Sequence, residues 1–257
     1  MAKRRSNAKS KQFHFEGDIS YNVVEMPNQK KFSHYDLKNI KPLTDSQKKV
    51  FDTWGEDLSM ELVGSAGTGK SMVALYLAMN EILTGQSEYN KLIIIRSAVP
   101  SREVGHLPGT LQEKTEIYEL PYKQLFDDIF KKTNQYKYLK EAHIVDFQTT
   151  SFIRGLTFDN AIVLFDECQN ATYEELSTVI TRLAGTSKLI LCGDTKQNDL
   201  IFRKSDVSGF QKFLNITRTM PSMRKVTFTL QDVVRGGLVK EFLQSEEWYE
   251  EQRNKGK

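Results

Sequence analysis

The chain has few cysteines and no long apolar segment. Its 257 residues include two cysteines, Cys168 and Cys192, too few for a disulfide framework and without the spacing of metal ligands. This usage favours a reducing compartment. No run of about 18 apolar residues occurs, so we expect no membrane contact through a spanning helix. The basic N-terminus is not followed by the apolar segment of a secretory signal, which predicts an intracellular, cytoplasmic protein.

An excess of one charge is also missing from most of the chain. Lysine and arginine number 36 against 33 aspartates and glutamates, a formal net charge of +3. Residues 1–12 contain five basic side chains and no acidic one, so the remainder is close to neutral. Composition alone therefore does not indicate a nucleic-acid-binding protein, but the N-terminal arm does. We predict that Arg4 and Arg5 in this arm contact nucleic acid.

The hydrophobic pattern divides the chain into three parts. Residues 1–40 are polar and poorly periodic, which predicts a flexible basic arm leading into a docking segment; residues 246–257 are interpreted as a polar C-terminal tail. Between them, over residues 41–245, short apolar runs alternate with helical periodicity. The expected strands cover 60–63, 91–98, 142–147, 160–167, 187–194 and 225–230, and the expected helices begin at Thr44 or cover 70–83, 122–132 and 172–183. Strands alternating with helices predict one α/β domain with a mostly parallel sheet and helices on both faces.

The strongest local pattern is GSAGTGKS at residues 64–71, directly after an apolar run and at the start of a helical pattern. Glycines permit a curled backbone whose amide N–H groups point inward, and the helix N-terminus adds positive potential, so the loop suits phosphate groups. A lysine and a hydroxyl at its end suit the β- and γ-phosphates and Mg²⁺. The pattern predicts a Mg²⁺·nucleotide site formed by Gly64, Ser65, Ala66, Gly67, Thr68, Gly69, Lys70, Ser71 and Met72.

Two further apolar runs end in polar residues suited to triphosphate chemistry. Residues 161–165 lead into Asp166, which we expect to hold the metal, and Glu167, which we expect to polarise the attacking water. The run at 187–192 leads through Asp194 to Gln197, which could hydrogen-bond a γ-phosphate oxygen or the attacking water. Since parallel strands end at the same edge of a sheet, these groups are predicted to lie together. A carboxylate beside the metal favours hydrolysis over transfer to a small acceptor.

Taken together, these motifs resemble the PhoH family, P-loop ATPases related to the core of superfamily 1 helicases. The resemblance extends from Leu43 to Leu243, and it implies a RecA-like P-loop NTPase fold and ATP with Mg²⁺ as ligands. It rests on GSAGTGKS at 64–71, FDECQN at 165–170, GDTKQND at 193–199, the run from Arg96 to Lys114, SFIRGLTFDNA at 151–161 and DVVRGGLV at 232–239. It also implies that Gln47 reads adenine and that Arg235 reaches the γ-phosphate. The chain departs from the common pattern after Arg96, where many relatives have proline, and at Cys168, where alanine is usual.

The same resemblance suggests partners. Superfamily 1 helicases close a cleft between two cores, whereas this chain has length for one, so we expect a ring-shaped homo-oligomer, a hexamer, in which a neighbour completes the site. The sequence does not choose among Arg102, Arg154, Arg182 and Arg203 as the arginine supplied by the neighbour. Single-stranded nucleic acid, either RNA or DNA with RNA favoured, is the expected further partner, with Arg96 and Arg102 as additional contacts.

Other P-loop functions remain open at this point. A GTPase would need an Asn-Lys-x-Asp motif, and residues 195–198 (TKQN) lack its final acid. A small-molecule kinase could use the same phosphate loop and acidic strand end. A nucleotide-gated binding protein without hydrolysis is the third alternative.

Overall fold

The computed structural model describes residues 32–97, 111–194 and 209–255. Within these ranges no helix is long and apolar enough to cross a membrane. The strands are β1 (Ser59–Gly64), β2 (Lys91–Arg96), β3 (Val145–Thr149), β4 (Ala161–Asp166), β5 (Ser187–Gly193) and β6 (Met223–Phe228). The α-helices are α1 (Asp45–Trp54), α2 (Lys70–Thr84), α3 (Leu111–Ile129), α4 (Gln135–Glu141), α5 (Tyr173–Thr181), α6 (Gly209–Thr217) and α7 (Gly237–Lys255). Short 3₁₀ turns include η1 (His34–Asp36), η3 (Thr150–Phe152), η4 (Cys168–Asn170) and η6 (Leu230–Asp232).

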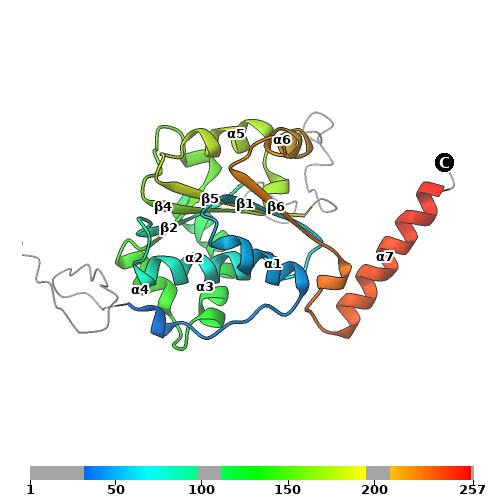
Figure 1. The fold of residues 1–257 in the computed structure, drawn as a ribbon, viewed down its shortest axis with the longest axis horizontal. Coiled ribbons are helices and arrows are strands. Elements are labelled where there is room, and N and C mark those ends of the chain that lie inside the picture. Colours follow the sequence, from blue (N-terminus) through cyan, green and yellow to red (C-terminus); the bar gives the residue numbers. More distant parts are fainter. Residues whose placement is uncertain (1–31, 98–110, 195–208, 256–257) are drawn as a thin grey trace, which may run out of the picture.

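The six strands form one sheet in the order β3-β2-β4-β5-β1-β6, and every paired neighbour is parallel. Helices α1 to α4 lie on one side of the sheet and α5 and α6 on the other (Figure 1). This arrangement confirms the predicted RecA-like α/β fold. Because all strands run the same way, their carboxyl ends meet at one edge, where the loops after them can build a single site.

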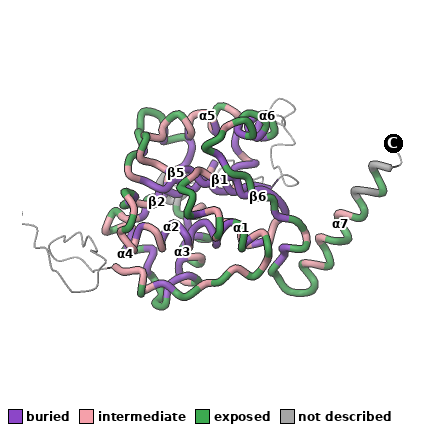
Figure 2. Tube along the Cα trace, in the orientation of Figure 1, coloured by how far each residue is buried: buried purple, intermediate pink, exposed green. Residues whose placement is uncertain are grey.

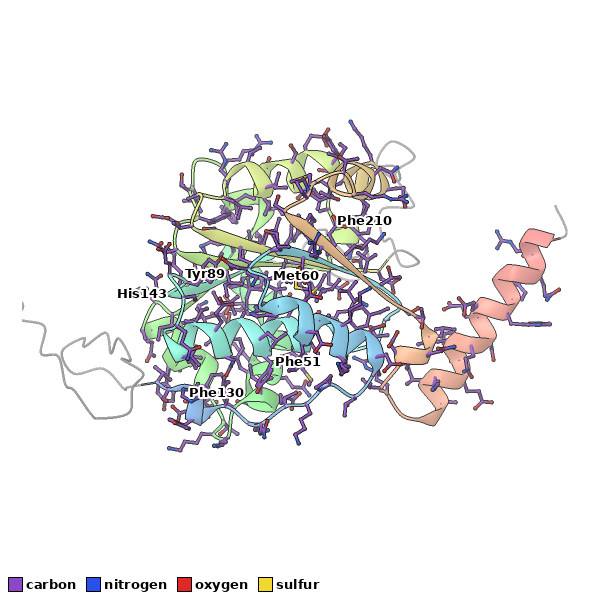
Figure 3. All side chains as sticks on the ribbon, in the orientation of Figure 1. Phe51, Met60, Tyr89, Phe130, His143 and Phe210 are labelled. Carbon is purple, nitrogen blue, oxygen red and sulfur yellow. The ribbon has the colours of Figure 1, made fainter. Side chains whose placement is uncertain are left out.

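The sheet is buried because each of its faces contacts an apolar helical layer. The central strand β4 is buried along its whole length, as its continuous apolar sequence predicted (Figure 2). On one face Met60 of β1 and Phe130, directly after α3, belong to one apolar cluster against which Phe51 of α1 packs; on the other face Phe210 of α6 joins the second cluster (Figure 3). The two cores hold the strand ends at fixed positions relative to α1 and α2.

Three of the differences from the sequence-based expectation have a clear physical cause. Helix α3 begins at Leu111 rather than at residue 122 and continues through Pro121, because its buried face contacts the core on both sides of the proline. Strand β3 begins at Val145 rather than at residue 142, after His143 adopts a left-handed φ of 57°. Residues 246–255, expected as a polar tail, continue α7, in keeping with their glutamates and glutamine, which favour helix.

A buried lysine anchors the end of α1 that lies away from the phosphate loop. Lys188, 1% exposed, donates to the Trp54 carbonyl oxygen at 3.0 Å and lies 4.4 Å from the centroid of the Trp54 ring. Its ammonium is 3.7 Å from Asp57 and 3.8 Å from Glu81, so the buried charge is compensated. Desolvation lowers the pKa of Lys188 in spite of these carboxylates. The C-terminal end of α1 is thereby fixed to β5.

A second buried ionisable side chain, Glu61, predicts that the stability of the fold depends on pH. Glu61, in the middle of β1, is 1% exposed, and its Oε1 has no hydrogen-bond partner among the described residues. Burial raises the pKa of Glu61 above its ordinary value of 4.5, although Thr217 and Lys225 oppose the shift. The folded chain therefore binds this proton more tightly than the unfolded chain, and stability falls as pH rises from 4.5 through the folded pKa.

We expect Glu61→Gln to remove this dependence. In urea unfolding, the variant should gain stability over the unaltered chain as pH rises towards neutrality, by more than the roughly 0.5 kcal/mol scatter of surface substitutions. Glu88→Gln, at an exposed position, is the control and should give a constant difference. If the difference in unfolding free energy between Glu61→Gln and the unaltered chain did not change with pH, Glu61 would not be the source of the pH dependence.

Candidate nucleotide-binding site

The phosphate loop is built from glycines in conformations that other residues rarely adopt. Gly64, Gly67 and Gly69 have φ angles of 140°, 73° and 79°. Gly69 is the N-cap of α2, and Lys70 is the first residue of that helix. A side chain at Gly64 is excluded for a second reason, because a Cβ there would lie 1.9 Å from the Phe228 carbonyl oxygen of β6. The loop thus presents backbone N–H groups at a helix N-terminus, as the sequence predicted.

Lys70 turns back into this loop. Its Nζ donates to the carbonyl oxygens of Gly64 and Ser65, both at 2.7 Å, and lies 3.4 Å from the Thr68 hydroxyl. The ammonium is therefore held at the mouth of the loop by carbonyl oxygens. A phosphate bound there would exchange these neutral acceptors for charged ones, which form stronger hydrogen bonds with an ammonium.

Gln47 supports the loop from α1. Its side chain is 3% exposed; Nε2 donates to the Thr68 carbonyl oxygen at 2.9 Å, and Oε1 accepts from the Leu43 N–H at 2.8 Å. A Cβ at Gly69 would lie 3.0 Å from Gln47 Nε2, so this glycine also makes room for the amide. Gln47 lies at the site, as predicted, and it braces the loop backbone. A contact with adenine remains a prediction.

Arg235 reaches the loop from the segment after β6. The N–H of Val234 donates to the Gly67 carbonyl oxygen at 3.2 Å, and a Cβ at Gly67 would lie 3.3 Å from Arg235 Cδ. The Arg235 side chain therefore runs across the phosphate loop of its own chain, while the residue is exposed. The role at the γ-phosphate that we assigned to Arg235 remains a prediction.

Asp232 ties the Arg235 segment to the start of α1. Its carboxylate accepts from the Ser46 hydroxyl at 2.9 Å and from the Thr229 N–H at 2.9 Å. Burial alone would raise the pKa of Asp232, but the hydrogen bonds from Thr229, Thr44 and Ser46 outweigh it and lower that pKa. Ser46 directly precedes Gln47, and Asp232 lies three residues before Arg235. The hydrogen bond between Ser46 and Asp232 therefore connects the two segments that contact the phosphate loop.

A pair of hard oxygen donors lies at the far end of the loop. The Ser71 hydroxyl donates to Asp166 Oδ1 at 2.6 Å, although the two residues are 95 positions apart in the sequence. Asp166 is 7% exposed at the end of β4, and its Oδ2 accepts from the Tyr122 hydroxyl at 2.9 Å. Burial and the neighbouring carboxylate raise the pKa of Tyr122, so the phenol keeps its proton as a donor. A hydroxyl and a carboxylate at this distance fit the oxygen ligands that Mg²⁺ prefers.

Glu167 stands beside this pair and is itself held in place. It adopts a left-handed φ of 51°, and its Oε2 accepts from Gln169 Nε2 at 2.7 Å. Gln169 Oε1 in turn accepts from the Asp194 N–H at 3.0 Å, which joins the ends of β4 and β5. Burial and Asp166 raise the pKa of Glu167, opposed by the Gln169 hydrogen bond and by the charges of Arg96 and Lys70. A carboxylate with a raised pKa suits a general base.

Arg96 lies at this edge too. It ends β2 as the register partner of Asp166, and its guanidinium is 5.7 Å from the centroid of the Tyr118 ring. Its charge lowers the pKa of Glu167, so it acts electrostatically on the candidate site. The role in nucleic-acid binding that we assigned to it remains a prediction.

The described residues bring together most of the predicted site. Five predicted residues fall outside them: Arg4, Arg5, Arg102, Gln197 and Arg203. Of the candidate arginines for a neighbouring subunit, Arg154 is exposed just after β3 and η3, on the carboxyl side of an edge strand. Arg182, at the end of α5, pairs through its backbone with Phe158 before β4 begins, so it lies towards the opposite edge.

Sequence reasoning missed Tyr122, Gln169 and Asp232 as site residues. Gln169 and Asp232 do belong to quoted motifs, FDECQN and DVVRGGLV, and membership of those motifs was the available signal. Tyr122 had none, because it comes from a helix 44 residues before its partner.

The chain matches a known protein family over most of its length. The family model described as PhoH-like protein matches residues 39–247. The chain belongs to the PhoH family. A PhoH-like protein of Mycobacterium tuberculosis is 33% identical over 220 residues, 83% of this chain and 60% of the relative. Protein PhoH of Escherichia coli is 30% identical over 177 residues, 68% of this chain and 49% of the relative.

The residues matched to the PhoH family include both the phosphate loop and the acidic end of β4. The chain spans about half to 60% of the length of these curated relatives. Among solved structures, the large terminase of a thermophilic bacteriophage is 13% identical with a TM-score of 0.49, covering 79% of this chain and 50% of the terminase.

Proposed function

We propose that this PhoH-family chain binds Mg²⁺·ATP and hydrolyses it. The observation that carries the proposal is the 2.6 Å contact between Ser71 Oγ and Asp166 Oδ1 at the end of a glycine loop that holds Lys70. Ser71 and Asp166 would hold the metal directly or through water, while Lys70 and Arg235 would contact the phosphates. Mg²⁺ would neutralise phosphate charge as the γ-phosphoryl group is transferred.

Hydrolysis is favoured over transfer to a dedicated acceptor because Glu167 stands beside the metal ligands. Burial and the hydrogen bond from Gln169 hold this single carboxylate beside Asp166, and we assign it the activation of the attacking water. Gln169 hydrogen-bonds both Glu167 and the backbone N–H of Asp194. A movement at the end of β5 would therefore shift the carboxylate of the proposed base. A kinase would instead need room here for its acceptor.

We further propose coupling to single-stranded nucleic acid, with RNA as the first substrate to test. Support comes from the five basic residues within positions 1–12 and from the kinship of the family with helicase cores. Phosphate contacts by lysine and arginine would make the binding weaken as salt is added.

A ring-shaped homo-oligomer, a hexamer, is the proposed assembly. Arg154, exposed beyond edge strand β3, is the described arginine best placed to reach a neighbour's site. Helix α7 extends from the body (Figure 1), and it leaves Leu238, Phe242 and Trp248 between 62% and 80% exposed. A neighbouring copy that covered these side chains would remove apolar area from water.

Phosphate-release kinetics and a mass measurement in solution together distinguish an ATPase from a GTPase or a kinase and test the ring. We expect steady-state release of free phosphate from ATP that requires Mg²⁺, exceeds release from GTP, and rises when single-stranded RNA is added. Light scattering in Mg²⁺·ATP should give a mass several times 29.6 kDa. Phosphate release from GTP alone would favour a GTPase, and release that appears only with a small acceptor would favour a kinase. A monomeric mass would contradict the ring, and RNA without effect on binding or rate would contradict the coupling.

A further inference from the structure

Tyr122 is a buried side chain that reaches the metal-binding carboxylate from outside every recognised motif. It lies on α3, is 1% exposed, and packs against the Phe147 ring at a centroid distance of 5.6 Å. Its hydroxyl donates to Asp166 Oδ2 at 2.9 Å. A buried phenol whose hydroxyl has a carboxylate acceptor is held by both packing and hydrogen bonding.

The two oxygens of Asp166 have different partners. Oδ1 accepts from Ser71, on the side of the phosphate loop, whereas Oδ2 accepts from Tyr122, on the side of α3. Donors from two separate elements fix the plane of the carboxylate. Without the phenol, Asp166 could rotate about its terminal torsion, which is intrinsically soft, and Oδ1 would no longer be directed towards Ser71.

The neighbouring turn of α3 makes a parallel contact. Tyr118, four residues before Tyr122 and so on the same face of the helix, packs its ring against the Arg96 guanidinium. Arg96 and Asp166 are register partners at the ends of β2 and β4. The two tyrosines therefore brace two adjacent strand ends from a single helix.

We infer that Tyr122 is a positioning residue that holds Asp166 Oδ2 so that Oδ1, together with the Ser71 hydroxyl, faces the Mg²⁺ of a bound nucleotide. The inference rests on the proposed function. Hydrogen bonds to the ligands of a metal orient them, and removing such a partner typically lowers metal affinity by about 10–100-fold. Nucleotide binding in the absence of metal depends on the phosphate loop and should not need Tyr122.

The test is Tyr122→Phe, which removes the hydroxyl and keeps the ring. ADP affinity would be measured by calorimetry in EDTA and over a Mg²⁺ titration, and Mn²⁺ affinity at saturating ADP by electron paramagnetic resonance. We expect the metal concentration for half-saturation to rise about 10–100-fold, with ADP affinity in EDTA within about twofold of the unaltered chain.

The matched control is Tyr136→Phe. Tyr136 is 3% exposed, and its hydroxyl donates to Glu119 Oε2 at 3.1 Å. The Tyr136→Phe variant therefore loses a buried hydrogen bond of the same kind, between a phenol and a carboxylate, away from the site. Its metal dependence should be unchanged. Adding Tyr122→Phe to Asp166→Asn should have little further effect on metal affinity, since a positioning residue acts through its partner.

An unchanged Mg²⁺ midpoint in Tyr122→Phe, an equal loss of ADP affinity in EDTA, or the same shift in Tyr136→Phe would overturn the inference and leave the proposed function standing. If the unaltered chain bound ADP with no dependence on Mg²⁺, the proposed function would fail together with the inference. A misfolded Tyr122→Phe protein would be recognised by its lost circular dichroism, and the role of the phenol would then be one of folding, against the inference.

Discussion

Replacing Lys70 by alanine is expected to reduce Mg²⁺·ATP hydrolysis by on the order of 10²–10³-fold, the loss typical of removing one preorganised donor to developing charge. The ammonium is already held at the loop mouth, 2.7 Å from the carbonyl oxygens of Gly64 and Ser65. The ammonium is thus already in the loop, and a bound phosphate would replace these neutral acceptors with charged ones. The rate of phosphate release under saturating Mg²⁺·ATP measures the effect.

Loss of folding should not explain that result. Gly64 and Ser65 are buried, but removing the half-buried Lys70 side chain leaves space in which water can bind their carbonyl oxygens, so the melting temperature should change little. Lys48→Ala on α1 removes an exposed lysine whose ion pair with Asp52 lies in solvent, and it should hydrolyse ATP as the unaltered chain does. Hydrolysis by Lys70→Ala within about threefold of the unaltered rate would contradict the assignment and favour a nucleotide-gated binding protein.

The second large effect concerns stability rather than rate. Gly64→Ala would place a Cβ 1.9 Å from the Phe228 carbonyl oxygen at a φ of 140°, a region that residues with side chains rarely adopt. Backbone strain and overpacking each cost about 1–3 kcal/mol, so we expect a loss of at least about 3 kcal/mol. Urea unfolding at neutral pH measures this loss.

Gly55→Ala is the matched control for this substitution. Gly55 follows α1 with a φ of −69°, and a Cβ there would meet no atom within 4 Å. This variant should be as stable as the unaltered chain or slightly more stable, because alanine restricts the unfolded chain. Gly64→Ala stability within about 1 kcal/mol of that of Gly55→Ala would show that β1 and β6 can separate without cost, contrary to the close packing described.

The fold class and the phosphate loop could be predicted from residue patterns alone. Residues 64–71 form the loop because glycines at 64, 67 and 69 allow positive φ, a property of each residue that needs no knowledge of its neighbours. Continuous apolar runs such as residues 161–165 indicated strands buried on both faces, and the structure buries β4 completely. The candidates Asp166 and Glu167 followed, since parallel strands deliver their last residues to one edge.

The contacts that support this edge of the sheet become visible only in the folded chain. Tyr122 contacts Asp166 across 44 positions and Asp232 contacts Ser46 across 186, and neither pairing leaves a periodic or local signal. Helix α3 begins earlier and α7 continues farther than the local patterns indicated, because a buried helix face carries α3 through Pro121 and high helix propensity continues α7 beyond residue 245. Local patterns encode backbone conformation and burial, whereas the partners of a side chain depend on which distant segments the packed sheet brings into contact.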